Sequence, residues 1–167
     1  MSIELRNWKD ADCTALAEIA NDPQIAEQLR DTFPSPYTEE DAAFFINLAR
    51  RTTDDKGWLY AITENGSVVG GISLTFGDDV YHRSAELGYW VGRSRWGHGV
   101  ASEAVRQICE KAFRETDTIR IEAETLTTNP GSIRVLEKNL FIREGYFCQR
   151  VCKNGKLLDS VLFACFK

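Results

Sequence analysis

The chain has 167 residues and a formal net charge of -5 at neutral pH. This length predicts a single domain over residues 1–167, which buries roughly 70% of the surface of the unfolded chain and needs no disulfide bonds. The acidic balance argues against nucleic acid as a partner, because such binding relies on clustered Lys and Arg, and it suits an amine-bearing partner better.

The first part of the chain predicts a strand, a helix and an irregular segment. Its opening residues, "MSIELRNWKDADC", carry charges from Glu4 onward and no apolar run, so we expect neither a signal peptide nor a membrane span. No membrane partner is expected. A short strand is expected around Ile3–Leu5 and a helix from about Asp12. Three prolines are then expected to break regular structure: Pro23, Pro34 and Pro36.

Residues 38–76 predict a second helix followed by a hairpin. Thr38 is expected to cap the helix, and we interpret its apolar stripe as core packing. The stripe consists of Ala42, Phe45, Ile46 and Ala49. Two strands then flank Asn65-Gly66, the type of dipeptide that adopts the positive φ angles of a tight turn.

The second half of the chain predicts alternating strands and helices. A third strand, "SAELGYWVG", precedes a helix at about 99–115, and the alternating stretch "IRIEAETL" predicts a half-buried strand. Asn129 and Pro130 mark the start of another helix, whose stripe is Ile133, Leu136 and Leu140. Two strands hinged at Asn154-Gly155 close the chain. The order β-α-α-β-β-β-α-β-α-β-β indicates an α/β (α+β) fold, with one mixed, mainly antiparallel sheet of about seven strands flanked by about four helices.

The stretch "GYWVGRSRWGHGVASEAV", residues 88–105, places three glycines between a strand and the start of a helix. Glycine there allows a positive φ angle or the close approach of a ligand. Because a helix N-terminus presents unpaired N–H groups, the turn at 92–102 could cradle a pyrophosphate, with Arg93, Arg95 and His98 adding cationic or donor groups. An ordinary glycine-rich connection would look the same, so the loop alone leaves both interpretations open.

Two other phosphate-binding motifs fit this loop less well. The P-loop pattern G-x-x-x-x-G-K-[ST] does not occur in the sequence. A dinucleotide fingerprint would need a third glycine where Ser102 stands, and the loop does not open a βαβ unit, although Glu122 and Glu124 follow at a tolerable distance for a ribose contact.

The ordered motifs resemble the GNAT superfamily of acetyl-CoA-dependent N-acetyltransferases over essentially the whole chain. The family signature Q/R-x-x-G-x-G/A aligns with "WGHGVA", with Trp96 at the Q/R position. Four stretches are similar to the ribosomal-protein N-terminal (Rim-type) subgroup: "AELGYWVG", "WGHGVASEA", "PSPYTEED", and the set Asn129, Ser132, Glu137 and Lys138. The subgroup's "LGF-x-x-EG" is "NLFIREG" here, with Leu140 at the glycine.

The resemblance implies that acetyl-CoA is the co-substrate. Its pyrophosphate would rest on the backbone amides of Gly97 to Ser102, and its pantetheine arm would lie where the strand holding Val91 and the strand near Leu126 splay apart. Asn129 would hold the pantetheine, cap its helix, or do both. The implied cofactor-binding residues are Val91, Gly92, Trp96, Gly97, His98, Gly99, Val100, Ala101, Ser102 and Asn129.

Amide formation from a thioester needs a neutral amine, a base and a donor for the departing thiolate. We predict Glu86 as the base, since a period of two places it on the strand face of Gly88 and Trp90; an exposed glutamate, or one tied to an Arg, is the alternative. Ser132 resembles the subgroup's serine that donates to the thiolate, although a first-turn serine can also make only local hydrogen bonds. Tyr146 is the reserve acid.

The acceptor is expected, by analogy, at a mouth lined by residues 27–37. This segment offers Arg30, Asp31, Phe33 and Tyr37. We expect an enzyme that moves the acetyl group to a primary amine by direct attack in a ternary complex, the amine being a protein N-terminal α-amine or that of a small molecule. The alternative is a non-catalytic acyl-CoA sensor on the same fold, which would lose the acid-base groups that Glu86, Asn129 and Ser132 supply.

The five cysteines are odd in number and scattered, without a C-x-x-C pair. This usage fits free thiols in a reducing compartment, so we expect a cytoplasmic protein. With two histidines and no clustered thiols, no metal site is expected. An exposed sheet edge at the C-terminal hairpin could mediate a homodimer.

Overall fold

The computed structural model describes residues 2–167, which form seven strands and five α-helices. The strands are β1 (Ile3–Asn7), β2 (Gly57–Glu64), β3 (Ser67–Phe76), β4 (Ser84–Val91), β5 (Arg120–Leu126), β6 (Ile142–Lys153) and β7 (Lys156–Phe166). The helices are α1 (Cys13–Ala20), α2 (Pro23–Ala26), α3 (Glu39–Arg51), α4 (Val100–Glu115) and α5 (Pro130–Lys138). Single 3-10 turns lie at Asp10–Asp12, Asp79–Tyr81 and Arg93–Arg95.

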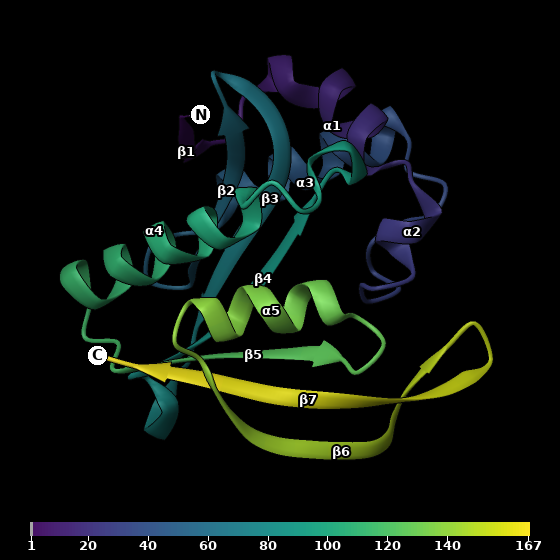
Figure 1. The fold of residues 1–167 in the computed structure, drawn as a ribbon. Helices are drawn as coiled ribbons and strands as arrows, with labels where there is room; N and C mark the ends of the chain where they lie inside the picture. The colour runs from purple at the N-terminus through teal and green to yellow at the C-terminus, as the bar shows by residue number, and fades with distance from the viewer. Residues whose placement is uncertain (1) are drawn as a thin grey trace.

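The strands form one sheet in the order β1-β2-β3-β4-β5-β7-β6. Neighbouring strands are antiparallel except β4 and β5, which run parallel. This parallel ladder joins only Ser84–Glu86 to Arg120–Glu122, and beyond it the two strands diverge (Figure 1). The mixed, mainly antiparallel sheet and the splay between the ends of β4 and β5 are therefore confirmed.

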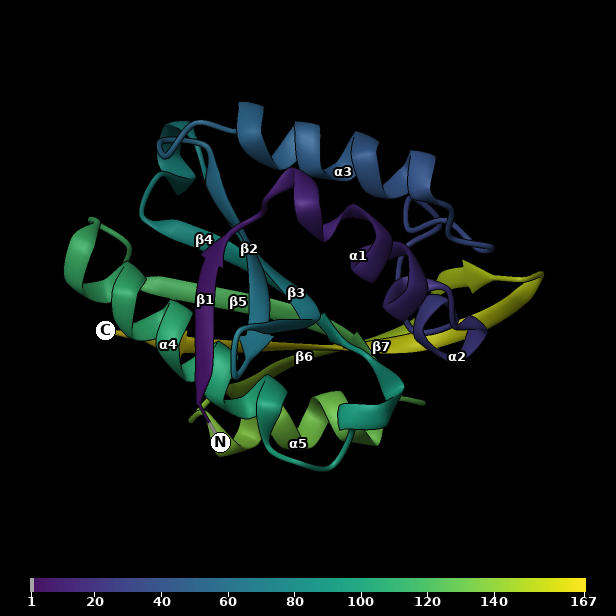
Figure 2. The ribbon, with the colours of Figure 1, turned by 90° about the horizontal axis from the view of Figure 1, so that it is seen from above.

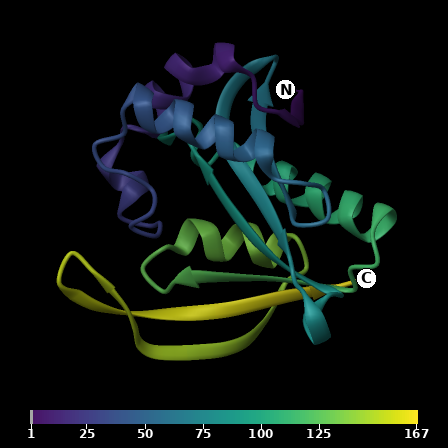
Figure 3. The same cartoon turned by 180° about the vertical axis from the view of Figure 1, so that it is seen from behind.

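Helices cover both faces of the sheet. Helices α1 and α3 lie on one face, and α4 and α5 lie on the other (Figure 2). Because side chains alternate along a strand, β4 contributes to both layers: Leu87 packs into the core under α4, whereas Trp90 packs against the core under α1 and α3. Seen from behind, α3 lies on the near side, in front of the sheet (Figure 3).

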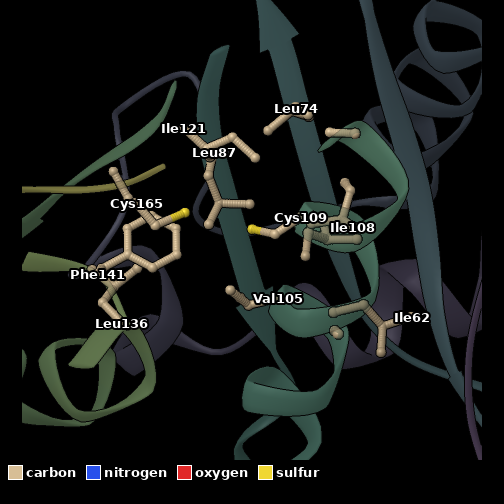
Figure 4. Packing of buried hydrophobic residues seen from close by; sticks show 14 of the residues in the cluster. Ile62, Leu74, Leu87, Val105, Ile108, Cys109, Ile121, Leu136, Phe141 and Cys165 are labelled. Atoms are coloured by element: carbon tan, nitrogen blue, oxygen red, sulfur yellow. The ribbon is translucent and has the colours of Figure 1, made fainter. Parts of the chain in front are cut away.

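The larger core lies between the sheet and helices α4 and α5. Val105 and Ile108 of α4 are fully buried, and they lie near Leu87 of β4 (Figure 4). Burying an aliphatic side chain of this size contributes about 1.5–3 kcal/mol, so the apolar stripe of α4 is what fixes this helix against the sheet. The start of α4, with the loop that precedes it, is thereby held at the end of β4.

Local capping and turn signals were predicted correctly. Thr38 and Asp41 form a reciprocal capping box at the start of α3, with the Asp41 amide donating to Thr38 Oγ1 at 3.2 Å and the Thr38 amide donating to Asp41 Oδ2 at 2.8 Å. Asn65 and Gly66 have φ angles of 50° and 86°, as the tight turn between β2 and β3 requires.

The expectation that Pro23 breaks regular structure is wrong. Pro23 is the first residue of the short helix α2, and the side chain of Asp22 caps it by accepting from the Gln24 amide at 2.9 Å. Proline is tolerated at this position because the first amide of a helix has no intrahelical partner. Residues 2–167 therefore form one α-helix more than the predicted number of about four.

Leu140 does not continue the apolar stripe of α5. Its side chain is 84% exposed, and its φ angle is 63°, in the left-handed region. The amide of Leu140 donates to Glu137 O at 3.1 Å, and the amide of Phe141 donates to Leu136 O at 3.1 Å. These two bonds form a Schellman motif, in which Leu140 occupies the position that glycine usually takes, so the helix ends here.

Within residues 2–167, no helix combines the length and the apolar character needed to cross a membrane.

Candidate active site

The loop between β4 and α4 is shaped by two glycines with left-handed backbone. Gly97 has a φ angle of 77° and Gly99 one of 82°, and Gly99 is the N-cap of α4. Side chains rarely adopt these angles, which explains the glycines. Trp96 Nε1 donates to Val91 O at 2.7 Å and so ties the loop to the end of β4.

This loop offers a row of unpaired backbone donors. Between residues 97 and 102, five of the six backbone amides donate to no acceptor within residues 2–167. They are the amides of Gly97, Gly99, Val100, Ala101 and Ser102. The amide of Glu103 is the first that turns back into the helix, donating to Gly99 O at 3.0 Å. Free amides at the positive end of a helix of this length fit the pyrophosphate of a coenzyme A molecule.

The sequence suggested that Arg93 and Arg95 add cationic groups to this loop, but both side chains form ion pairs with other segments. Arg93 Nε lies 2.9 Å from Asp22 Oδ2, and Arg95 Nε lies 2.6 Å from Glu64 Oε2. Both guanidinium groups are therefore engaged with carboxylates of other segments. His98 stays at the loop, where its Nδ1 lies 2.9 Å from Trp96 O.

A hollow of about 670 Å³ adjoins the first turn of α4. This volume is within the usual range of small-molecule sites. Asn139, just after α5, spans part of its wall by donating from Nδ2 to Ser102 O at 3.1 Å. The residues around the hollow are Ser2, Ile3, His98, Gly99, Ser102, Glu103, Arg106, Lys138 and Asn139.

The end of β4 is partly engaged within the protein. The amide of Gly92 donates to Val69 O at 2.8 Å, and Val91 O accepts from Trp96 as described above. A carbonyl oxygen has two lone pairs, so Val91 O can accept one more hydrogen bond from an amide-bearing ligand.

Asn129 and Ser132 lie at the start of α5, beside the opening between β4 and β5. Asn129 Oδ1 accepts from the Ser132 amide at 3.1 Å, so Asn129 caps this helix. Ser132 Oγ lies 2.8 Å from Tyr89 Oη, which comes from β4. Burial raises the pKa of Tyr89 to about 12. Sequence analysis missed this tyrosine, because no local pattern links it to a serine 43 residues away.

Glu86 lies on the opposite face of β4 from Tyr89. Its Oε1 accepts from Arg30 Nη2 at 2.5 Å, which is the arginine-tied arrangement that the sequence left open. Both side chains are largely exposed, at 78% for Arg30 and 51% for Glu86. An ion pair this exposed contributes about 1 kcal/mol or less, so Glu86 is easily freed to contact another group.

The segment 27–37 is divided between surface and core. Arg30 is exposed, whereas Tyr37 is only 6% exposed and burial raises its pKa to about 12. Phe33 links the two, with its ring 5.5 Å from the Trp90 ring and 5.0 Å from the Tyr37 ring. Tyr37 therefore packs in the core under α1 and α3 and does not face the surface.

A second hollow, of about 430 Å³, opens beside Arg30. The β6–β7 hairpin closes one side of it, where Lys153 Nζ donates to Leu29 O at 2.8 Å. Glu124, which was not predicted as a site residue, holds the other side by accepting from Arg150 Nε at 2.9 Å. The residues around it are Gln28, Leu29, Arg30, Glu124, Thr125, Leu126, Arg150, Val151, Lys153 and Ser160.

Tyr146, the reserve acid, lies on the edge strand β6 and is separated from β5 by β7. Its hydroxyl donates to Asp159 Oδ2, and this contact raises its pKa. Tyr146 is thus occupied outside the opening between β4 and β5.

The five cysteines are free, and residues 2–167 bring no three His, Cys, Asp or Glu side chains together as a metal site would need. Cys109 and Cys165 are buried and point toward one another in the core (Figure 4).

Comparison with known proteins agrees with this geometry. A family model for an acetyltransferase (GNAT) domain matches residues 2–142. An uncharacterized N-acetyltransferase p20 of Bacillus licheniformis is 28% identical over 169 residues, which cover 99% of this chain and 93% of that protein. The putative ribosomal N-acetyltransferase YdaF of Bacillus subtilis is 29% identical and covers 100% of this chain and 91% of its own length.

Among solved structures, RimL, a ribosomal L7/L12 α-N-protein acetyltransferase in complex with coenzyme A, has the same fold. It superposes with a TM-score of 0.90 at 21% identity, over 99% of this chain and 94% of RimL. The family match over most of the chain, together with the glycine loop and the opening between β4 and β5, shows that the chain belongs to the GNAT acetyltransferase family and is an acetyl-CoA-dependent N-acetyltransferase.

Proposed function

We propose that the chain transfers the acetyl group to a primary amine by direct attack in a ternary complex, and that an α-amine is the favoured acceptor, whether a protein N-terminus or a small molecule carries it. The observation that carries this proposal is the early end of the parallel ladder at Glu86 and Glu122, next to the unpaired amides of residues 97–102. Together they form a slot with a phosphate-binding end.

The two faces of β4 support separate entry of donor and acceptor. Tyr89 and the glycine loop are on the side of α4 and α5, whereas Glu86 and the hollow beside Arg30 are on the other side. An amine entering by that hollow would approach the slot from the face opposite the coenzyme. Such an arrangement lets both substrates be present at once.

The acidity of amines favours an α-amine. The nucleophile must be neutral, and at pH 7 this costs about 1 kcal/mol for an α-amine with a pKa of about 7.7–8.0, but about 4.6 kcal/mol for a lysine with a pKa of about 10.4. The difference is about 3.6 kcal/mol, or two to three orders of magnitude in the neutral fraction.

Three side chains take named roles in this proposal. The coenzyme supplies an acetyl group as a thioester. Glu86, released from Arg30, accepts the proton of the amine directly or through a water. Ser132 donates a hydrogen bond from its hydroxyl to the departing sulfur. Asn129 orients Ser132 by capping its helix.

The experiment is an acceptor screen that follows thiol release from acetyl-CoA at pH 7. The matched pair is a lysine-free peptide with a free N-terminus and the same peptide with its N-terminus blocked; blocked peptides with one lysine, amino acids and polyamines complete the panel. We expect turnover with free α-amines and none with the blocked, lysine-free peptide. The rate with a lysine side chain should be at least about a hundredfold lower than the rate with an α-amine at pH 7, and it should rise toward pH 10. A lysine side chain or polyamine that outpaces every α-amine at pH 7 would contradict the proposal.

A further inference from the structure

Tyr89 links the two sides of the opening between β4 and β5. It lies on β4 beyond the last residue pair of the parallel ladder, and its hydroxyl reaches α5, which packs on β5. Tyr89 Oη lies 2.8 Å from Ser132 Oγ and 3.2 Å from Ser132 O. Its ring packs against the core under α4 and α5, so the hydroxyl has a fixed position.

The chemistry of the oxygen atoms fixes the direction of one of these two hydrogen bonds. A carbonyl oxygen only accepts, so Tyr89 donates in its contact with Ser132 O. The same proton lies within reach of Ser132 Oγ. Either hydroxyl can be the donor in that second contact. When Tyr89 donates to Oγ, Ser132 keeps its own proton for a third partner, and within residues 2–167 no acceptor other than Tyr89 Oη is hydrogen-bonded to Ser132 Oγ.

The surroundings keep Tyr89 a donor at every pH at which the enzyme would work. Burial raises the pKa of Tyr89 to about 12. The hydrogen bond with Ser132 on α5 acts in the opposite direction and lowers this pKa, whereas Cys109 on α4 also raises it. On β4 itself, Glu86 points to the other face. Tyr89 therefore stays protonated well above neutral pH.

We propose that Tyr89 is a positioning residue, which holds the Ser132 hydroxyl so that its proton is directed to the leaving sulfur. This inference rests on the proposed function. In the reaction, the lone pair of the amine forms the new C–N bond, and the pair of the broken C–S bond leaves with the sulfur as a thiolate. The amine proton goes to Glu86 or water, while Ser132 and Tyr89 donate hydrogen bonds and keep their protons; nothing is oxidised or reduced.

The first test needs no acceptor and measures binding of free coenzyme A by calorimetry between pH 6.5 and 9.5, with desulfo-coenzyme A as the reference ligand. A thiol has an ordinary pKa of about 8.5, so a donor that stabilises the thiolate makes coenzyme A bind more tightly as the pH rises, by about tenfold for each unit by which it lowers that pKa. Desulfo-coenzyme A has no sulfur and should show no such gain.

We expect the wild-type gain to be about tenfold, a charge-assisted hydrogen bond being worth about one pKa unit or more. Tyr89→Phe should cut the gain to threefold or less, and Ser132→Ala should abolish it, while both variants bind desulfo-coenzyme A within about twofold of wild type. Ser132→Thr, which keeps a hydroxyl, should restore part of the gain. Tyr60→Phe is the matched control, since Tyr60 lies on the same face of the sheet, two strands away on β2, and should change neither ligand's binding.

The inference would be overturned if Tyr89→Phe showed the full wild-type rise in coenzyme A affinity with pH. It would also be overturned if Tyr89→Phe lost affinity equally for coenzyme A and desulfo-coenzyme A, because an equal loss indicates a merely structural role. If coenzyme A itself does not bind wild type, the proposed site fails first and Tyr89 is not at issue. In turnover, Tyr89→Phe should lower kcat about tenfold with the KM for acetyl-CoA within about twofold, and the double variant should be no slower than Ser132→Ala. Additive losses would contradict the positioning role.

Discussion

Replacing Leu140 by glycine should stabilise the protein. Leu140 holds the left-handed position of the Schellman motif with a φ angle of 63°. A residue with a side chain pays about 1–2 kcal/mol for that conformation, and glycine loses about 0.4–1 kcal/mol more chain entropy on folding. Because the side chain is 84% exposed, its removal sacrifices little burial. The balance predicts a gain of about 1 kcal/mol in the free energy of unfolding, or roughly 3 °C in Tm for a chain of this size.

The assay is urea and thermal unfolding of wild type, Leu140→Gly and Leu140→Ala. The alanine variant removes the exposed side chain but keeps a Cβ at the positive φ, so it should show no gain. The reasoning about backbone conformation is refuted if Leu140→Ala stabilises as much as Leu140→Gly, since then exposure of the side chain is the cause. It is equally refuted if Leu140→Gly is less stable than wild type.

Three further predictions concern the site and its surroundings. Glu86→Gln should lower kcat roughly a hundredfold with the acetyl-CoA KM nearly unchanged, and wild-type turnover would remove Glu86 from the mechanism. Gly99→Ala has a matched control in Gly66→Ala, because the two glycines have φ angles of 82° and 86° and no atom lies near the added Cβ at either position. Each variant should lose about 1 kcal/mol of stability, but in calorimetry only Gly99→Ala should weaken coenzyme A binding. Equal binding losses would contradict the loop's role. Burial raises the pKa values of Tyr37 and Tyr89 to about 12 from an ordinary value of about 10. The free energy of unfolding should therefore be constant below pH 10 and fall as the pH rises through 12. Urea unfolding that is unchanged between pH 9 and 11 would contradict the burial of these two side chains.

Much of the fold was predictable because its signals are local. Thr38 with Asp41 and the pair Asn65-Gly66 act within four residues, so the sequence contains both the cause and the effect. The errors arose where one residue type serves two purposes. Pro23 ends a helix in most contexts but begins one after Asp22, and Leu140 continues the apolar spacing of α5 although the helix has already ended.

The candidate site was less predictable because its contacts join distant segments. Arg30 and Glu86 are separated by 56 residues, and Tyr89 and Ser132 by 43, so no periodicity links them. The glycine loop was identifiable, since Gly97 and Gly99 carry their conformational requirement in the residue type itself. Arg93 was misjudged for the same reason that Tyr89 was missed: its partner, Asp22, lies on another element.

The short β4–β5 ladder also makes this sheet two units joined at a corner. Strands β1 to β4 form one unit and β5 to β7 the other, with three residue pairs between them and with contacts between α4 and α5 beyond. An extended ligand that hydrogen-bonds to both facing strands would act as an eighth strand. Binding of the coenzyme between β4 and β5 should then couple the unfolding of the two units, so that the coenzyme stabilises the fold as well as taking part in the reaction.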